Sequence, residues 1–319
     1  MDILFVTATR IGDAVLSTGL LAWLIERHPG ARVTVAAGPV AAPLFAAVPG
    51  LERIIVMRKQ PLSAHWLALW GAVAARRWDI VVDLRGSALA WMLRARRRRV
   101  MAKGDPRKHR IAQLGQLFDL DPPPMPVTWT APSHDRAAEQ LIPPGLPVLA
   151  LGPGANWRAK LWRIERFVEL ARRLTVPEGP LPGARVAVLA AEHERELVEP
   201  LLAAIPARRI IDLVGRVDLL TAAAVLRRSA LYIGNDSGLM HLAAAVGTPT
   251  LGLFGPSLID QFHPVGPYCA SVRTALPPEA LFSPNFDHRT TDTLMDSLSV
   301  ETVEAAARGL WSRVTSKAA

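Results

Sequence analysis

The stretch YIGNDSGLMHLAAAVGTPTLGLFGPS, residues 232–257, decides the fold of the second half of this 319-residue chain. An apolar run predicts a buried strand, and the polar turn NDSG over 235–238 leads directly into an alanine-rich helix that begins at Leu239. This geometry leaves the backbone N–H groups of Ser237, Gly238 and Leu239 free at a helix N-terminus, where the helix dipole favours an anion. The stretch therefore predicts a phosphate-binding turn.

The same residues also permit a purely structural interpretation. Asp236 or Ser237 in this turn is typical of a helix cap, which needs no ligand. His241 lies one turn into the predicted helix, where a buried histidine is more often structural than functional. From the residues alone, both interpretations stay open.

Outward from this stretch, the chain alternates short β-branched runs with longer amphipathic runs, which is typical of parallel sheets with crossover helices. Strands are predicted over 3–9, 32–37, 53–57, 79–84, 147–151, 185–190, 210–213, 231–234 and 250–254, and helices over 14–27, 66–77, 89–99, 164–174, 195–205, 220–228, 239–246 and 300–313. Eight prolines within residues 121–147 predict a stiff linker without a helix. The pattern predicts an α/β fold of two doubly wound domains, with the active site in a cleft between them at the strand carboxyl ends.

Composition excludes several classes of protein. Hydrophobic residues make up 50% and charged residues 20%, which excludes disordered and collagen-like chains. The single cysteine, Cys269, excludes an intrachain disulfide and any multi-cysteine metal site. The N-terminal stretch MDILFVTATR lacks the features of a secretory signal, so we expect a cytoplasmic protein. The net charge of +9 fits an anionic partner, and a compositional bias toward arginine is the alternative explanation.

Five blocks, in the same order along the chain, resemble those of the family 9 glycosyltransferases, the ADP-heptose:lipopolysaccharide heptosyltransferases and their relatives. These blocks are TRIGDAVLSTGLLAWLI (9–25), WDIVVDLRGS (78–87), GPGANWRAKLWRIERFVELA (152–171), LAAEHERE (189–196) and the stretch over 232–257 quoted above. The resemblance implies a GT-B architecture, in which two Rossmann-like domains face each other across a cleft. It implies an acceptor-binding domain over 1–140, a nucleotide-sugar-binding domain over 147–298 and a final helix over 299–319 that packs back toward the first domain.

The resemblance also implies an activity, the inverting transfer of heptose from ADP-heptose to a lipopolysaccharide core or a related surface glycan. It assigns Asp13 as the general base, a role that contributes about 10² to 10⁴ in rate, and Lys160 as the cation on the donor diphosphate. The implied donor-binding residues are Asn156, Glu194, Asp236, Ser237, Gly238, Leu239 and His241. A helix cap is the alternative role for Asp13, and a solvated charge is the alternative for Glu194.

Arg10, beside Asp13, and Arg58 with Lys59, at the carboxyl end of a predicted strand, are candidate acceptor-binding residues. We expect no metal ion and no cofactor, because no acidic DxD triplet stands where a divalent cation could bridge the diphosphate, and the histidines lack ligand spacing. The lysine and the helix N-terminus would take the place of the metal.

Basic side chains gather over residues 94–110, on and after a predicted helix. They fit an anionic glycolipid acceptor and a peripheral contact with the inner face of the inner membrane, at about 1 kcal/mol per basic residue. A solvated helix face is the alternative. Nucleic acid is not an expected partner, since aromatic residues are only 6% of the chain and no nucleic-acid motif is present.

The sequence can be compared with the requirements of two other functions. A Rossmann dehydrogenase needs a G-x-G-x-x-G turn after its first strand, whereas residues 7–14 read TATRIGDA. A non-catalytic protein that binds a nucleotide sugar or carbohydrate remains an alternative, because a fold does not determine an activity. The presence of both Asp13 and Lys160 favours the enzyme.

Overall fold

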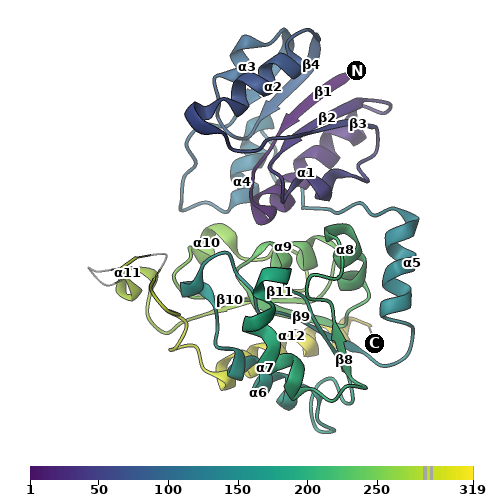
Figure 1. The fold of residues 1–319 in the computed structure, drawn as a ribbon, viewed down its shortest axis with the longest axis vertical. Coiled ribbons are helices and arrows are strands. Elements are labelled where there is room, and N and C mark those ends of the chain that lie inside the picture. The colour runs from purple at the N-terminus through teal and green to yellow at the C-terminus, as the bar shows by residue number, and fades with distance from the viewer. Residues whose placement is uncertain (283–285, 288–289, 319) are drawn as a thin grey trace. The chain divides into compact units, whose positions relative to one another are not determined.

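The computed structural model describes residues 1–282, 286–287 and 290–318. The chain divides into two compact units, Met1–Ala131 and Pro132–Ala319. Each unit contains one parallel sheet with helices on its faces (Figure 1). The α/β fold predicted from the sequence is therefore confirmed.

The first unit is built on a five-stranded sheet in the order β3-β2-β1-β4-β5. Its elements are β1 (Asp2–Val6), α1 (Ile11–Arg27), β2 (Arg32–Ala37), η1 (Ala42–Phe45), β3 (Leu51–Val56), η2 (Pro61–Ser63), α2 (His65–Val73), β4 (Trp78–Asp83), α3 (Leu89–Met92), β5 (Ala95–Val100), α4 (Arg110–Gly115) and η3 (Gln116–Phe118), where η marks a short 3₁₀ helix. All the strand pairs are parallel. The strand order reverses between β1 and β4, and a crevice forms at such a switch point.

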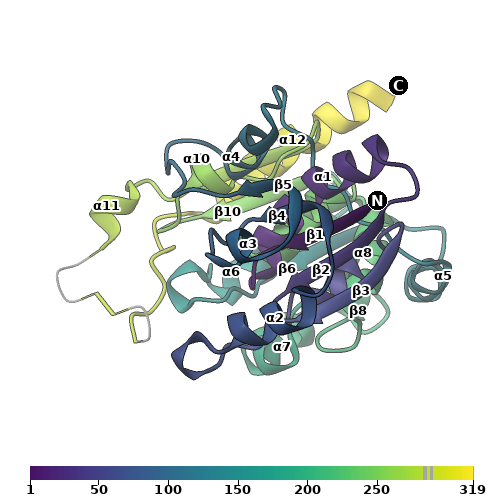
Figure 2. The same ribbon diagram turned by 90° about the horizontal axis from the view of Figure 1, so that it is seen from above.

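The strands at the centre of this sheet are apolar on both faces because helices cover both. Leu4 and Val81 pack with α2 and α3 in one buried cluster. The chain runs from β1 to β2 in one direction and from β3 to β4 in the other, so right-handed crossovers put α1 on the opposite face from α2. Figure 2 shows the unit from above, with α2 and α3 as neighbours.

The second unit is built on a six-stranded parallel sheet in the order β11-β10-β9-β6-β7-β8. Its elements are α5 (Pro132–Leu141), β6 (Val148–Gly152), η4 (Arg158–Lys160), α6 (Ile164–Thr175), β7 (Arg185–Val188), η5 (Glu192–Glu194), α7 (Arg195–Ala204), β8 (Ile210–Asp212), α8 (Leu219–Arg227), β9 (Leu231–Asn235), α9 (Gly238–Ala245), β10 (Thr250–Phe254), α10 (Ile259–Phe262), β11 (Cys269–Arg273), α11 (Pro278–Leu281) and α12 (Val300–Ala318). The strand order reverses between β6 and β9, which places a second switch point at the polar turn of the stretch quoted first, directly after β9.

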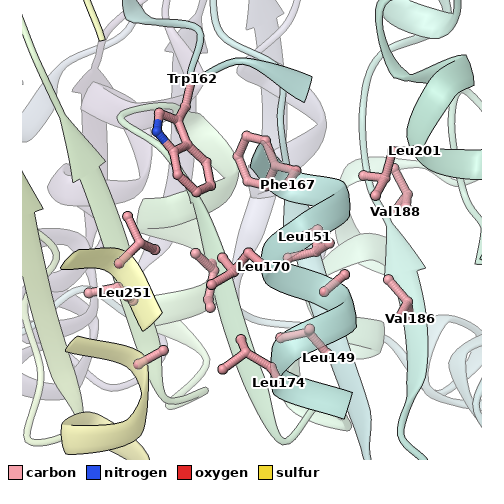
Figure 3. Packing of buried hydrophobic residues seen from close by; sticks show 14 of the residues in the cluster. Leu149, Leu151, Trp162, Phe167, Leu170, Leu174, Val186, Val188, Leu201 and Leu251 are labelled. Carbon is pink, nitrogen blue, oxygen red and sulfur yellow. The ribbon is translucent and has the colours of Figure 1, made fainter. Parts of the chain in front are cut away.

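The core of the second unit forms where α6 lies on the sheet. The apolar residues of α6 recur at helical spacing, and its buried residues include Phe167, Leu170 and Leu174. Figure 3 shows these side chains packed near Leu149 and Leu151 of β6. Burying side chains of this size contributes about 1.5–3 kcal/mol each, so this packing fixes the position of the loop that precedes α6.

The last helix, α12, begins as the sequence predicts. The Ser299 hydroxyl accepts a hydrogen bond from the Thr302 N–H at 3.2 Å, which is the geometry of a helix cap. Val303, Ala307 and Leu310 on its apolar side are buried in the core of the second unit, where α12 contacts α6, β10 and β11. Its packing back toward the first unit stays a prediction.

The predicted helix over 89–99 is wrong. Helix α3 ends at Met92, and residues 95–100 form the edge strand β5. Arg98 explains part of the difference, because its guanidinium donates to the backbone oxygens of Ala90 and Leu93 and so fastens the strand beside α3. The periodicity also missed β11, a half-buried strand at the other sheet's edge.

The expectation of a helix-free linker is also wrong, because α5 lies within residues 121–147. Pro132 opens this helix at a position where a missing N–H costs no helical hydrogen bond. The helix packs against α8 of the second unit. The part of the segment before α5 instead follows α1, where the Val127 N–H donates to the Thr18 hydroxyl at 3.0 Å.

Gly19 in the middle of α1 tests this contact with the proline-rich segment. A Cβ at Gly19 would lie 2.4 Å from the Met125 carbonyl oxygen, so Gly19→Ala must displace the backbone. We expect a loss of about 1–3 kcal/mol in the free energy of unfolding, measured by urea denaturation. Gly71→Ala in α2 is the matched control, since its Cβ meets nothing within 4 Å, and it should stabilise the protein by about 0.5–1 kcal/mol. Equal effects of the two variants would contradict the close approach at Gly19.

Candidate functional site

The first unit has a cavity of about 250 Å³ at the carboxyl ends of β1 and β4. It therefore lies at the switch point of the first sheet, where doubly wound proteins bind ligands. It is lined by Thr7, Ala8, Thr9, Arg10, Asp13, Ser17, Leu84, Arg85, Arg110 and Leu114. Of the predicted site residues, this cavity brings together Asp13 and Arg10.

Asp13 lies in the first turn of α1 and is partly buried. Arg10, not Asp13, occupies the cap position of this helix, and the Arg10 side chain makes no capping hydrogen bond. A carboxylate in the first turn is favoured by the helix dipole. Asp13 is thus a carboxylate that lines a cavity, and the alternative role as the cap residue does not apply.

Arg110, the first residue of α4, also lines this cavity. Burial lowers the pKa of its guanidinium below the ordinary value, and the nearby negative charge of Asp13 opposes that shift. The cavity therefore contains the carboxylate of Asp13 and a partly desolvated cation, Arg110. Sequence reasoning counted Arg110 only as part of the basic stretch over 94–110, and no local pattern distinguishes it there.

The rim of the cavity is held by polar contacts of Asp83, the last residue of β4. Asp83 is fully buried and accepts hydrogen bonds from the backbone N–H groups of Arg85 at 2.8 Å and Ser87 at 2.9 Å. The loop that carries Arg85 is fixed by these contacts. The Arg85 guanidinium lies 5.2 Å from the centre of the Trp66 ring, a cation–π contact that joins this loop to α2.

Arg58 and Lys59 are not among the residues that line the cavity. They follow β3, the outer strand of the sheet, and both are exposed. Strand β2 separates β3 from β1, which leads to Asp13. Their role in acceptor binding stays a prediction.

In the second unit, Lys160 and Asp236 form a close ion pair. The Lys160 ammonium lies 2.6 Å from a carboxylate oxygen of Asp236, and the two side chains are only 18% and 6% exposed. Lys160 ends the short helix that follows β6, and Asp236 follows β9 directly. The imidazole Nε2 of buried His241 lies 4.0 Å from the other oxygen of Asp236. These three predicted donor-site residues therefore meet at the second switch point.

Asn235, the last residue of β9, holds the Lys160 loop in place. Its side chain is fully buried, and its amide nitrogen donates to the Pro153 carbonyl oxygen at 2.7 Å. Its amide oxygen accepts a hydrogen bond from the Trp162 N–H at 3.1 Å. One side chain thus ties both ends of the loop to the strand beside it. Sequence reasoning missed Asn235 as a site residue, although an asparagine that ends a buried strand is an available signal.

The turn after β9 fits the predicted geometry. Ser237 is the cap residue of α9, yet its side chain makes no capping hydrogen bond. The hydroxyl of Tyr232 lies close to the ends of β6 and β9. A Cβ at Gly152 or Gly234 would approach this hydroxyl to 2.0 or 2.3 Å, respectively. Burial raises the pKa of this phenol, so it is neutral at physiological pH. The glycines therefore make room for the buried phenol at the ends of β6 and β9.

Glu194 lies against the same loop. One of its carboxylate oxygens accepts a hydrogen bond from the Ala191 N–H at 2.9 Å. A Cβ at Gly154 would lie 2.4 Å from that oxygen, which shows how closely the carboxylate approaches the loop after β6. Asn156, in the same loop, is exposed. Glu194 therefore lies beside the loop after β6, its contact with Ala191 is that of a capping box, and its role at the ribose stays a prediction.

No group of three or more His, Cys, Asp or Glu side chains suited to a metal ion is found within residues 1–282, 286–287 and 290–318. The positive charge of the second site comes from Lys160 and the N-terminus of α9.

Comparisons with known proteins agree with this architecture. The model of glycosyltransferase family 9 (heptosyltransferase) matches residues 85–285. The chain is 26% identical over 307 residues to lipopolysaccharide heptosyltransferase 2 of Salmonella typhimurium, across 83% of this chain and 86% of that protein. The structure of E. coli ADP-heptose lps heptosyltransferase II matches with a TM-score of 0.76 at 21% identity, over 99% of this chain and 100% of that one. E. coli heptosyltransferase WaaC with ADP matches with a TM-score of 0.72 at 18% identity, over 97% and 100% of the two chains.

Two parallel Rossmann-like sheets, each with charged residues at its own switch point, match the GT-B fold of the E. coli heptosyltransferase II structure. The family match covers more than half of the sequence, and the chain belongs to glycosyltransferase family 9, the heptosyltransferase family. The family predicted from the five sequence blocks is confirmed.

Asn235→Ala tests whether this side chain organises the second site. The change leaves the Trp162 N–H and the Pro153 carbonyl without their partner, at a cost of about 1–3 kcal/mol for each buried group. We expect a lower unfolding free energy in urea, together with faster proteolysis within the loop between β6 and α6. Asn156→Ala, at an exposed position of the same loop, should leave the unfolding free energy unchanged. Wild-type stability of Asn235→Ala would show that the loop is held by other contacts.

Proposed function

We propose that this protein transfers heptose from ADP-heptose to a lipopolysaccharide core or a related surface glycan, with inversion at the anomeric carbon and with protein groups in place of a metal ion. Family membership supports sugar transfer, and the name of the Salmonella typhimurium relative supports the heptose and the acceptor. The E. coli relative solved with ADP supports the nucleotide. The observation that carries the proposal is the chemistry of the two switch points, since each supplies one half of an inverting transfer.

In the first unit, Asp13 is proposed as the general base. Its carboxylate takes the proton of the acceptor hydroxyl as the oxygen attacks the anomeric carbon, and the bond from that carbon to the diphosphate breaks. The partly desolvated Arg110 and the neighbouring Arg10 line the same cavity. These cations fit an anionic glycolipid or glycan acceptor, because a phosphate forms strong charge-assisted hydrogen bonds with arginine.

In the second unit, Lys160 is proposed to bind the donor diphosphate and to stabilise the ADP that leaves. Its ammonium is already positioned and partly shielded from water, which increases its effect on developing negative charge. When the diphosphate replaces Asp236 as the partner of the Lys160 ammonium, the Asp236 carboxylate becomes available to accept hydrogen bonds from the hydroxyl groups of the sugar. Glu194 fits the ribose hydroxyls as a carboxylate acceptor, and the remaining proposed donor contacts are Asn156, Ser237, Gly238, Leu239 and His241.

The proposal includes the arrangement of the domains. The acceptor domain (1–140) and the donor domain (147–298) would face each other across a cleft, with the helix over 299–319 returning to the first domain. Only such an arrangement brings the acceptor hydroxyl at Asp13 to a sugar held beside Lys160. The basic residues over 94–110 would favour an anionic acceptor and a peripheral contact with the inner face of the inner membrane.

Asp13→Asn tests the assigned base. The amide cannot accept the proton, so kcat for transfer from ADP-heptose should fall by about 10² to 10⁴. The dissociation constant for ADP, measured by calorimetry, should not change because ADP binds to the second unit. Asp119→Asn, an exposed carboxylate in the same unit, should keep the wild-type kcat.

Two outcomes would contradict the proposal. Wild-type kcat in Asp13→Asn would exclude Asp13 as the base. A wild-type protein that binds ADP but gives no transfer to any lipopolysaccharide core acceptor would favour the alternative, a non-catalytic nucleotide-sugar or carbohydrate-binding protein.

A further inference from the structure

Two neighbouring helices of the first unit expose large apolar side chains to solvent. Trp91 and Met92 of α3 are 70% and 63% exposed. The other members of the set lie in and just before α2. Together they form the apolar surface: Leu62, Leu67, Trp70, Trp91 and Met92. A concentration of this kind on adjacent elements is unusual for a surface that faces only water.

The two helices belong to one face of the sheet. Leu69 of α2 and Leu89 of α3 are buried in the same core cluster, with Leu4 and Val81 of the sheet beneath them. Both views of the ribbon show α2 and α3 as neighbours (Figures 1 and 2). The inner sides of the helices thus attach them to the core, and the apolar surface is what their outer sides present.

The backbone before α2 has a conformation that is rare for residues other than glycine. Leu62 and Ser63 have φ of 51° and 60°, in the left-handed region that residues other than glycine rarely adopt. The Leu62 side chain is nevertheless fully exposed, so this costly conformation gains no buried contact within the chain. Strained backbone that displays an apolar side chain is typical of a segment with a binding role.

The surroundings of the apolar surface are strongly positive. Apart from Arg76, which forms ion pairs with Asp2 and Glu52, residues 53–104 contain eleven Lys and Arg but only two acidic residues, Asp79 and Asp83. Both acids are engaged within the fold, because Asp83 is fully buried and Asp79 accepts a hydrogen bond from the Asp2 N–H. Among the cations near α3, Arg94 and Arg96 are exposed. The partner of this surface must therefore be apolar and negatively charged.

We infer that the apolar surface of α2 and α3 docks on an anionic phospholipid bilayer. Tryptophan is favoured at the boundary between lipid headgroups and acyl chains, and exposed leucine and methionine insert just below it. The surrounding arginines attract the anionic headgroups. No helix in the described part of the chain is long and apolar enough to cross a bilayer, and this contact is peripheral.

The inference builds on the membrane contact proposed above and assigns it to particular residues. It also changes the expected mode of binding. A surface held by charge alone releases the protein at high salt, whereas inserted apolar side chains retain part of the binding.

The test is co-sedimentation of the full chain with vesicles, without donor or acceptor, so that its result does not depend on the proposed reaction. The wild type should bind vesicles of phosphatidylglycerol and phosphatidylcholine more strongly than vesicles of phosphatidylcholine alone. The double variant Trp91→Ser, Met92→Ser should partition about tenfold more weakly into the anionic vesicles. Its thermal unfolding midpoint should match the wild type because both side chains are exposed.

The matched control replaces two apolar residues exposed elsewhere, Val40→Ser and Leu146→Ser, which are 60% and 57% exposed. This control should bind the vesicles as the wild type does. Equal partitioning of both double variants, or a wild type that does not bind anionic vesicles, would overturn the inference. If the double variant lost sugar transfer to a soluble acceptor but kept vesicle binding, the apolar surface would be part of the acceptor site instead, and the inference would be wrong.

Discussion

The ion pair between Lys160 and Asp236 is the interaction on which the second site depends. Both side chains are largely buried, and burying either charge without the other would carry a large desolvation penalty. The pair holds the Lys160 ammonium at the end of β9. In the proposed donor complex, the diphosphate would have to compete with Asp236 for Lys160. The proposal therefore includes an exchange of partners, in which the Asp236 carboxylate would be released when the phosphates bind.

The rest of the second unit maintains that pair. Asn235 bonds to both ends of the loop that carries Lys160, and Trp162, just after that loop, is buried in the core under α6. The first unit uses the same architectural rule at its own switch point, where Asp13 and Arg110 line one cavity. Parallel sheets of both units thus place charged side chains at strand carboxyl ends. Because each loop is anchored by its own sheet, each of the two candidate sites is held in place separately.

The sequence predicted the fold and much of the candidate site where hydrophobic period and local motifs coincide. The strand, turn and helix around Asp236 formed as expected. Here an apolar run followed directly by a polar turn specifies the local structure without help from distant contacts. The prediction from sequence failed at two places. Residues 95–100 have the local pattern of a basic helix, but strand pairing makes them the edge of a sheet. The proline-rich segment was expected to lack a helix, but Pro132 begins one because proline is tolerated in the first turn. Arg110 could not be assigned from spacing, because only the folded chain brings it to the cavity that Asp13 lines. Asn235 had a local signal, its place at the end of a buried strand, but its partners Pro153 and Trp162 are distant in sequence.

The most direct test of the central claim is calorimetry of ADP binding to Lys160→Met and Asp236→Asn. If the diphosphate displaces Asp236 from Lys160, loss of the ammonium should weaken ADP binding by about 10- to 100-fold, the value of a hydrogen bond to a charged group. Loss of the Asp236 charge should instead tighten ADP binding, because Lys160 no longer has a competing carboxylate. Shifts in opposite directions are the predicted result. If both variants bind ADP as the wild type does, the ion pair is purely structural and the account of the donor site is wrong.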